Sequence, residues 1–425
     1  MEKILIVSDS ISGPTGFATQ HRGLAWALAK EFDVYSLGLQ TLQEREARIV
    51  INNEERIVTE LPNLPRTGER YDFGQRSLPI WLERIKPDLL ITTNDIQMIS
   101  HIPQILCPDK IELKVIDLPL KKPISKETLQ MQLEGELQKF REKYPLDTRW
   151  LLYSPQDGVP AMPSWGFYYR FADQVVAMSK FGQNVFRQYF GMDVPYIYHG
   201  VDTSVFFPNR WKPPQLEGKF IIGDLNRNQP RKQPVRLIWA FSKFAKGKDD
   251  VLLHLQMDWR DPFGHPLDYF VNLYGIQNKI IRPRPVGMPI QDVAKTYNMW
   301  DVHACATGGE GFGLCIAESM GCGTPPIYTD YTTCRELIIE GEPSPRGQVV
   351  PWSTLHWDRM DVAASMRSLI DIDRMVDAFE LYYYDRELLE KHGENGARWV
   401  KKHLDWNKLQ YEWIDIVRKT LDKDD

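Results

Sequence analysis

The sequence predicts an α/β protein with two domains in series. Strand-like apolar runs alternate with helical stretches from the first residues, and the alternation restarts after residue 218. Such alternation is typical of parallel sheets that carry helices on their faces. The length of 425 residues also favours more than one domain, because a single domain usually holds about 150 residues.

The first half opens with Ile4–Ser10, a near-continuous apolar run that is expected of a strand covered on both faces. A Gly/Pro turn at residues 12–16 follows, and then a helix from about Phe17 to Lys30. Asn52–Gln75 is polar and rich in Pro and Gly, so we expect an irregular insertion there rather than a sheet strand. The other expected elements of this half are strands at Val34–Leu39, Asp88–Thr93, Leu113–Leu118, Trp150–Ser154, Gln174–Ser179 and Tyr196–His199, and a long helix at Lys126–Lys143.

A proline-rich stretch around residues 203–218 has little periodicity, which suits a linker between domains. The domains are therefore expected at 1–205 and 215–400, and the last 65 or so residues are expected to be helical, ending in the amphipathic stretch Asn407–Leu421. The second domain is expected to contain strands at Phe220–Leu225, Val251–Met257, Lys279–Arg282, Val302–Ala306 and Pro326–Thr329, and helices at about Val235–Phe244, Leu267–Tyr274, Gln291–Trp300 and Leu314–Met320.

The composition excludes some classes of function. A net charge of −5 provides no global positive field, so we do not expect non-specific nucleic-acid binding, although a local basic patch stays possible. No apolar run of about 18 residues predicts a transmembrane helix, and the N-terminus does not resemble a signal peptide. The five cysteines form no CxxC pair, which favours reduced thiols in a cytoplasmic protein, with peripheral membrane attachment left open.

Three glycine- or cation-bearing loops are candidates for ligand binding. The turn that ends at Gly16 follows a strand and opens a helix, so its amides could face an anion, but a plain tight turn is equally expected. It lacks the GxGxxG pattern of a dinucleotide site. Arg227 and Lys232 follow another strand, where two fixed cations would suit a diphosphate, although most such clusters are solvated loops.

The most informative segment is the glycine-rich run from Gly308 to Pro325. Glu310 lies in its loop and Glu318 about one turn into the helix that follows. The glycines let the backbone approach a ligand closely. A carboxylate in an otherwise apolar helix needs a hydrogen-bonding partner when buried, and vicinal ribose hydroxyls would provide one. The alternative places both glutamates on the surface.

This segment resembles the E-x7-E signature of retaining glycosyltransferases with the GT-B fold, particularly glycosyltransferase family 4. Tyr198–Thr203, with Phe206 and Pro208, is similar to the family's N-G-V-D-x-x-x-F-x-P motif, with His199 in place of the usual Asn. Arg227 and Lys232 have the family's spacing, with Asn226 where a glycine is usual, and Val176–Phe181 is similar to its serine strand.

The resemblance implies two Rossmann-like domains facing each other across a cleft, with the C-terminal helix at about 405–425 returning to the first, acceptor-side domain. It also implies that Glu310 contacts donor-sugar hydroxyls, that Glu318 holds the ribose, and that Arg227 and Lys232 stabilise the leaving diphosphate. The donor-binding residues are then expected to include Gly311, Phe312, Gly313, Leu314, Gly16 and Arg284.

The first-domain face of this cleft offers two further candidates. Asp157 occupies the stretch where family members often place a His near the donor sugar, and we expect it to be catalytic. Asn94 and Asp95 end another strand and are candidates for the acceptor side. The alternative for all three is a turn cap at a strand end. The aromatics Trp165, Phe167, Tyr168 and Tyr169 could form an acceptor platform, but core packing is the favoured use.

The implied reaction needs no cofactor and no metal ion. Asp371 and Asp373 have DxD spacing, but they lie between helical stretches and are expected to cap a helix, and the nine histidines form no ligand cluster. The donor is a UDP-, GDP- or ADP-sugar, while the acceptor and the oligomeric state stay open. The alternatives are a sugar-nucleotide epimerase or hydrolase and a non-catalytic nucleotide-sugar-binding protein.

Overall fold

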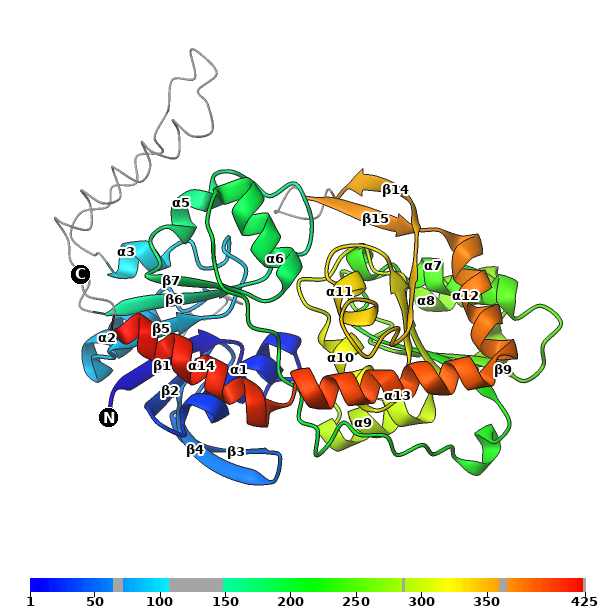
Figure 1. Ribbon diagram of the computed structural model, residues 1–425, viewed down its shortest axis with the longest axis horizontal. Coiled ribbons are helices and arrows are strands. Elements are labelled where there is room, and N and C mark those ends of the chain that lie inside the picture. Colours follow the sequence, from blue (N-terminus) through cyan, green and yellow to red (C-terminus); the bar gives the residue numbers. More distant parts are fainter. Residues whose placement is uncertain (64–71, 107–147, 285–286, 359–364, 423–425) are drawn as a thin grey trace, which may run out of the picture.

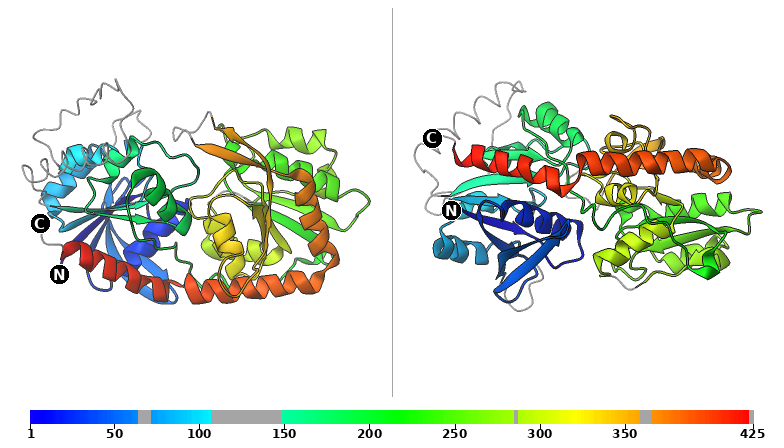
Figure 2. Two further views of the ribbon diagram at one scale, coloured as in Figure 1. Left: turned by 45° about the horizontal axis from the view of Figure 1, so that its top comes forward. Right: turned by 60° about the horizontal axis from the view of Figure 1, so that its bottom comes forward.

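The computed structural model describes residues 1–63, 72–106, 148–284, 287–358 and 365–422. The elements form two lobes side by side, each built on a mostly parallel sheet with helices on its faces (Figure 1, Figure 2). The predicted fold class is therefore confirmed.

The first sheet has the strand order β3-β4-β2-β1-β5-β6-β7. All of its pairings are parallel except β3 with β4. Ile4, Leu5, Ile6 and Val7 of its central strand have no exposed surface, as expected when helices cover both faces. The strands are β1 (Lys3–Ser8), β2 (Asp33–Gly38), β3 (Arg45–Ile51), β4 (Glu54–Pro62), β5 (Leu89–Thr92), β6 (Arg149–Ser154) and β7 (Gln174–Ala177).

Five described helices from the first half of the chain accompany this sheet. The first of them is capped by Thr15, whose hydroxyl accepts from the Ala18 amide at 3.0 Å. They are α1 (Gly16–Leu28), α2 (Ser77–Ile85), α3 (Ile102–Leu106), α5 (Trp165–Tyr169) and α6 (Lys180–Val185), the last continuing into a π-helical turn at Phe186–Phe190.

The expected irregular insertion at Asn52–Gln75 is wrong over its first part. Strands β3 and β4 form an antiparallel hairpin there, and β4 adds to the main sheet by pairing with β2. Asn52 and Asn53 form its tip with φ values of 51° and 63°, the left-handed turn that matches the twist of two strands. The strand signal was hidden because β4 begins with the charged residues Glu54, Glu55 and Arg56.

Two further expectations for this half have different outcomes. Tyr196–His199 does not form a strand, because a single bridge between Tyr196 and Ala177 is its only described pairing. The strand expected at Leu113–Leu118 and the helix expected at Lys126–Lys143 lie outside the described residues.

The second sheet is parallel, with the order β10-β9-β8-β11-β12-β13. Its strands are β8 (Phe220–Leu225), β9 (Val251–Gln256), β10 (Ile280–Ile281), β11 (Val302–Cys305), β12 (Pro326–Thr329) and β13 (Gln348–Val350). The helices around it are α7 (Pro234–Phe244), α8 (Leu267–Leu273), α9 (Ile290–Met299), α10 (Leu314–Gly321), α11 (Cys334–Ile338) and α12 (Ile372–Tyr384).

A β-hairpin interrupts the stretch that was expected to be helical from about residue 360. Strands β14 (Trp352–Trp357) and β15 (Met366–Ile370) pair antiparallel beside the first lobe (Figure 1). The Met366 amide donates to the carbonyl of Val159 in the first lobe at 3.0 Å. This hairpin therefore belongs to the second half of the chain but contacts the first.

The last two helices lead the chain back to its beginning. Helix α13 (Arg386–His403) runs along the second lobe and α14 (Trp406–Leu421) along the first (Figure 1). Trp406 fixes this return, because a Cβ added at Gly23 or Gly200 would lie 2.0 or 2.3 Å from its ring. The two glycines thus leave room for the Trp406 indole, and the C-terminal helix α14 packs against α1.

Candidate active site

The glycine-rich loop after β11 packs directly on a first-lobe loop. A Cβ at Gly309 would lie 2.2 Å from the backbone oxygen of Asp157, and one at Gly311 would lie 2.9 Å from Pro155. These contacts are shorter than side chains allow, so glycine is required at both positions. The loops at the carboxyl ends of β6 and β11 therefore meet face to face, at the sheet edge where α/β proteins bind ligands.

Glu310 lies in this loop between two cations. Its carboxylate accepts a hydrogen bond from Lys232 Nζ at 2.5 Å and lies 3.5 Å from Arg231 Nη1. Glu310 as a whole is 5% exposed. Burial alone would raise its pKa, but the charges of Lys232 and Arg231 outweigh burial and lower the pKa to about 2. Glu310 is therefore ionised and fixed in place.

Asp157 continues this chain of charges into the first lobe. Its carboxylate lies 3.6 Å from Arg231 Nε and 3.0 Å from Arg367 of β15. Arg231 thus bridges Asp157 and Glu310, and these two acids hold its pKa above the usual value although burial opposes them. The structure brings together the sequence candidates Lys232, Glu310 and Asp157.

Arg227, the other predicted cation, has a different position. Its side chain is 56% exposed and pairs with Asp261 at 2.7 Å. The physical reason is the 3₁₀ turn Pro230–Lys232, which turns the chain after Arg227 and directs the following cations inward. Sequence analysis missed Arg231, although its place directly before Lys232 was a usable signal.

Glu318 lines a hollow that does not include Glu310, Arg231 or Lys232. It is 7% exposed on α10 and accepts from the Tyr297 hydroxyl at 3.1 Å. Burial raises its pKa to about 8, while Tyr297 and the charge of Arg22 act in the opposite direction. Arg22 comes from α1 of the first lobe, so both halves of the chain line this hollow of about 710 Å³, open mouth included.

Arg22 is a second site residue that sequence analysis missed. Its Nε is buried and has no hydrogen-bond partner among the described residues. Burial lowers the pKa of its guanidinium, and Glu318 opposes that effect. A buried donor facing a carboxylate suits a polar ligand, but a single Arg within an amphipathic helix gives no sequence signal.

The remaining donor-binding candidates are spread along the loops. Gly16 begins α1 and a Cβ there would meet nothing within 4 Å. Phe312 is 3% exposed and packs on His199, with 4.5 Å between ring centroids. Gly313 has a φ of 99°, which allows α10 to begin at Leu314. None of these three residues lines the hollow around Glu318 or the one beside Asp157.

Three further candidates differ in their exposure to solvent. The side chain of Arg284 is exposed, while its amide and carbonyl are both held by Gln256. Asn94 is 4% exposed, and its Nδ2 has no hydrogen-bond partner among the described residues. Asp95 lines a small hollow with Asp157.

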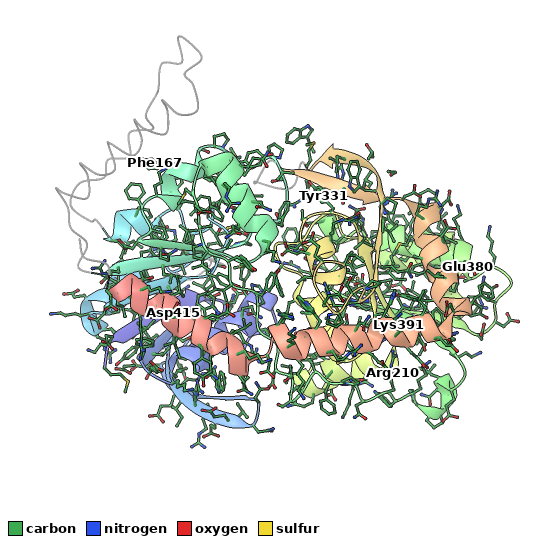
Figure 3. All side chains as sticks on the ribbon, in the orientation of Figure 1. Phe167, Arg210, Tyr331, Glu380, Lys391 and Asp415 are labelled. Atoms are coloured by element: carbon green, nitrogen blue, oxygen red, sulfur yellow. The ribbon has the colours of Figure 1, made fainter. Side chains whose placement is uncertain are left out.

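The other sequence predictions have clear outcomes. Asp371 caps α12 by accepting from the amides of Asp373 and Arg374, as predicted. Tyr169 is fully buried, and Phe167 makes edge-to-face contacts with Tyr168 and Phe171 on the outer part of the first lobe (Figure 3).

The cysteine and membrane predictions concern the part of the chain that the structure describes. Its four cysteines are free, while Cys107 lies outside. Across the described ranges, no three acidic, His or Cys side chains converge as metal ligands would. No described helix has both the length and the apolar composition that crossing a bilayer requires.

Comparisons with known proteins agree with this geometry. Residues 206–399 match the family model described as glycosyl transferases group 1. The D-inositol 3-phosphate glycosyltransferase of Paenarthrobacter aurescens is 28% identical over 151 residues, which are 33% of this chain and 36% of that protein. The match thus spans about a third of this curated relative.

Solved structures resemble the chain over its whole length. Sucrose-phosphate synthase from Thermosynechococcus elongatus has a TM-score of 0.69 at 16% identity, covering 99% of each chain. HepE from Anabaena, solved with UDP-glucose, has a TM-score of 0.63 at 15% identity, covering 99% of this chain and 100% of that one. A glycosyltransferase from Rickettsia africae scores 0.63 at 14% identity, covering 100% and 99%. The chain therefore has the GT-B fold, and its residues 206–399 are similar to the glycosyl transferases group 1 family.

Proposed function

We propose that the protein is a retaining, metal-independent glycosyltransferase that moves a sugar from a nucleotide diphosphate to an acceptor hydroxyl. The observation that carries the proposal is the Lys232–Glu310–Arg231 cluster, with Glu318 in a hollow lined by both lobes. The complex of the similar protein HepE with UDP-glucose supports a nucleotide sugar as donor.

In this proposal the charges have separate tasks. Lys232 and Arg231 stabilise the negative charge that develops on the departing diphosphate, so no divalent ion is needed for that purpose. Glu310 accepts from hydroxyls of the donor sugar, and Glu318 accepts from the ribose hydroxyls. The bond between the anomeric carbon and the phosphate oxygen breaks, the acceptor oxygen bonds to that carbon, and its proton passes to the leaving phosphate.

Retention is supported by the E-x7-E resemblance and by the state of the nearby acids. Glu310 and Asp157 both face Arg231, at 3.5 and 3.6 Å. Ion pairing makes each carboxylate a weaker nucleophile, which favours entry of the acceptor from the face that the diphosphate leaves. The expected anomeric configuration of the product is therefore that of the donor.

Thermal shift with UDP-, GDP- and ADP-glucose tests donor binding. A ligand at 100 times its Kd stabilises a protein by about 2.7 kcal/mol, so one of the three should raise the melting temperature, with or without EDTA. Glu318→Ala should abolish this rise because it removes the ribose contact. The matched control Glu394→Ala, at an exposed position of α13, should keep it.

The stereochemistry and the fate of the sugar complete the test. Proton NMR of the glycoside product should show the anomeric configuration of the donor. An inverted product would contradict retention, and a rate that EDTA removes and Mn²⁺ restores would contradict metal independence. Release of free sugar or of an epimer in the presence of acceptors would favour the hydrolase or epimerase alternative.

A further inference from the structure

A further buried carboxylate lies at the start of the loop that carries Lys232, residues 226–232, which we call the cation loop. Asp224 belongs to β8, directly before this loop, and has no exposed surface. Its Oδ1 accepts a hydrogen bond from Asn226 Nδ2 at 2.5 Å. Its Oδ2 is buried and has no hydrogen-bond donor among the described residues. An ionised oxygen without a donor is costly to bury, so this oxygen favours a bound proton.

Asn226 connects this carboxylate to both the cation loop and the helix after the glycine-rich loop. Its Nδ2 also donates to Cys305 Sγ at 3.4 Å, and the Cys305 thiol donates to the carbonyl of Lys232 at 3.7 Å. The thiol of Cys315, at the start of α10, donates to Asn226 Oδ1 at 3.9 Å. The first and last residues of the cation loop are therefore tied to the surroundings of Asp224.

The other titratable groups that face Asp224 come from neighbouring strands and are neutral. His303 of β11 has its Nε2 3.9 Å from Asp224 Oδ1 and 3.0 Å from the hydroxyl of Tyr328 of β12. Burial lowers the pKa of His303 to about 3. Burial also raises the pKa values of Tyr328 and Cys305 well above their usual values. The charge balance at Asp224 is therefore set by ionised groups of the donor site.

Two of these ionised groups act on Asp224 in opposite directions. Burial has the largest effect and raises the pKa of Asp224 from 3.8 to about 7. The hydrogen bonds of Asn226 and Cys305 and the charge of Lys232 lower the pKa, whereas the charge of Glu310 raises it. Near neutral pH, Asp224 is thus close to the point at which it gains or loses a proton, and a new charge beside Lys232 can move that point.

A nucleotide sugar would bring such a charge. In the proposed function its diphosphate pairs with Lys232, so its negative charges offset the cation that favours ionised Asp224. They also repel the carboxylate directly, and both effects favour the protonated form. A ligand that favours protonation of a group takes up a proton when it binds, and by linkage it binds more weakly as the pH rises.

We propose that Asp224 is a positioning residue of the donor site, which holds the cation loop through Asn226 and takes up a proton when a nucleotide diphosphate binds beside Lys232. The proton passes from the solvent to Oδ2, the oxygen that has no donor. A neutral Asp224 then leaves the charge of Lys232 to Glu310 and the diphosphate. The inference rests on the proposed function, because it requires a diphosphate at Lys232.

Calorimetry without an acceptor tests the proton uptake. Whichever of UDP-, GDP- and ADP-glucose gives the largest thermal shift is titrated at about pH 7.5 in two buffers of different ionisation enthalpy. We expect the wild type to take up roughly 0.3 proton or more beyond the Asp224→Asn variant. An equal uptake in the two proteins overturns the proposal.

The pH dependence of donor affinity provides a second readout. Between about pH 6 and pH 8.5 the Kd of the wild type should rise at least about threefold more than that of Asp224→Asn, since a pKa change of one unit corresponds to a factor of about ten. The phosphates of a nucleotide sugar keep their charges throughout this range. Glu318, with a pKa of about 8, is present in both proteins, so the difference reports Asp224. Parallel curves contradict the proposal.

Two further variants separate the charge of Asp224 from its place in the fold. Asn226→Gly removes the amide that lowers the pKa of Asp224, so the rise in Kd should begin at a higher pH than in the wild type. An unchanged curve in this variant contradicts the proposal, also if Asp224→Asn does not fold. The control Asp377→Asn, at an exposed position of α12, should follow the wild type.

The same titrations distinguish two kinds of failure. If none of the three nucleotide sugars binds to the wild type, the proposed function itself fails. If one of them binds with the same proton uptake in the wild type and in Asp224→Asn, the donor site stands and the role of Asp224 alone is wrong.

Discussion

Lys232 and Arg227 carry the same charge on the same loop, but their surroundings differ. Lys232 is nearly buried against Glu310, while Arg227 is half exposed beside Asp261. A preorganised cation in a desolvated site stabilises developing charge far better than a solvated one. Lys232, with Arg231 beside it, is therefore the cation that this loop holds in a desolvated position.

This difference predicts unequal effects of two matched variants. Lys232→Met should lower kcat by about 100-fold or more, as the loss of one preorganised charge does in other active sites. Arg227→Met should change kcat by no more than about threefold, the size of a typical surface effect. The measurement is kcat with the preferred donor, with melting curves to verify folding. Equal losses in both variants would show that Arg227 reaches the diphosphate once the donor is bound.

At this scale the sequence identified part of the site. Glu310, Glu318 and Lys232 follow strands β11 and β8 as the sequence predicted, and their roles in binding a donor stay predictions. Arg231 could have been selected from its place directly before Lys232, but Arg367 and Arg22 could not, since each acts through a contact with a residue distant in sequence. Arg227 met the spacing rule, but the 3₁₀ turn that separates it from Lys232 depends on local geometry.

Among the elements, the glycine-rich loop has a mechanical role besides ligand binding. A Cβ at Gly309 would meet the Asp157 carbonyl, a backbone atom that cannot turn away. Gly309→Ala should therefore separate the two loops and lower kcat at least tenfold, because a misplacement of about 1 Å can cost 100-fold. A melting temperature close to the wild-type value serves as the control for folding. Unchanged kcat would mean that the loops separate without loss during turnover.

The elements that sequence analysis found and missed differ in their packing. Strands buried on both faces, such as β1 and β8, are continuous apolar runs and were predicted. The hairpin strands β3, β4 and β14 have polar or exposed faces, so their composition resembles that of loops. Hairpin β14–β15 matters for the site, since it brings Arg367 to Asp157 and its Met366 carbonyl accepts from Tyr331 at 2.9 Å (Figure 3).

For the whole molecule, the central question is what holds the two lobes together. One contact is a helix cap supplied across the interface. Glu336 of α11, in the second lobe, accepts from the amides of Lys180 and Phe181 at the start of α6 in the first, at 3.2 and 2.9 Å. These amides have no partner within their own helix, so the carboxylate satisfies donors that would otherwise need water.

Burial of Glu336 makes this contact sensitive to pH. Desolvation raises its pKa from 4.5 to about 7, while the two amides and Lys180 act against the rise and Glu340 adds to it. Because the pKa of Glu336 is higher in the folded protein than in the unfolded chain, binding of its proton stabilises the fold. This stabilising contribution is complete below about pH 4.5. It is lost as the pH rises through about 7.

Glu336→Gln isolates this effect, because glutamine has nearly the same shape and no charge. Between pH 5.5 and pH 8.5 the melting temperature of the wild type should fall by about 2 °C more than that of the variant. Glu318 and Asp224 also have raised pKa values, at about 8 and about 7, so both proteins share their part of the pH dependence and the difference reports Glu336. The control Glu394→Gln should follow the wild type. Parallel curves for the wild type and Glu336→Gln would mean that the pKa of Glu336 is not raised in the folded protein and that this carboxylate is hydrated in solution.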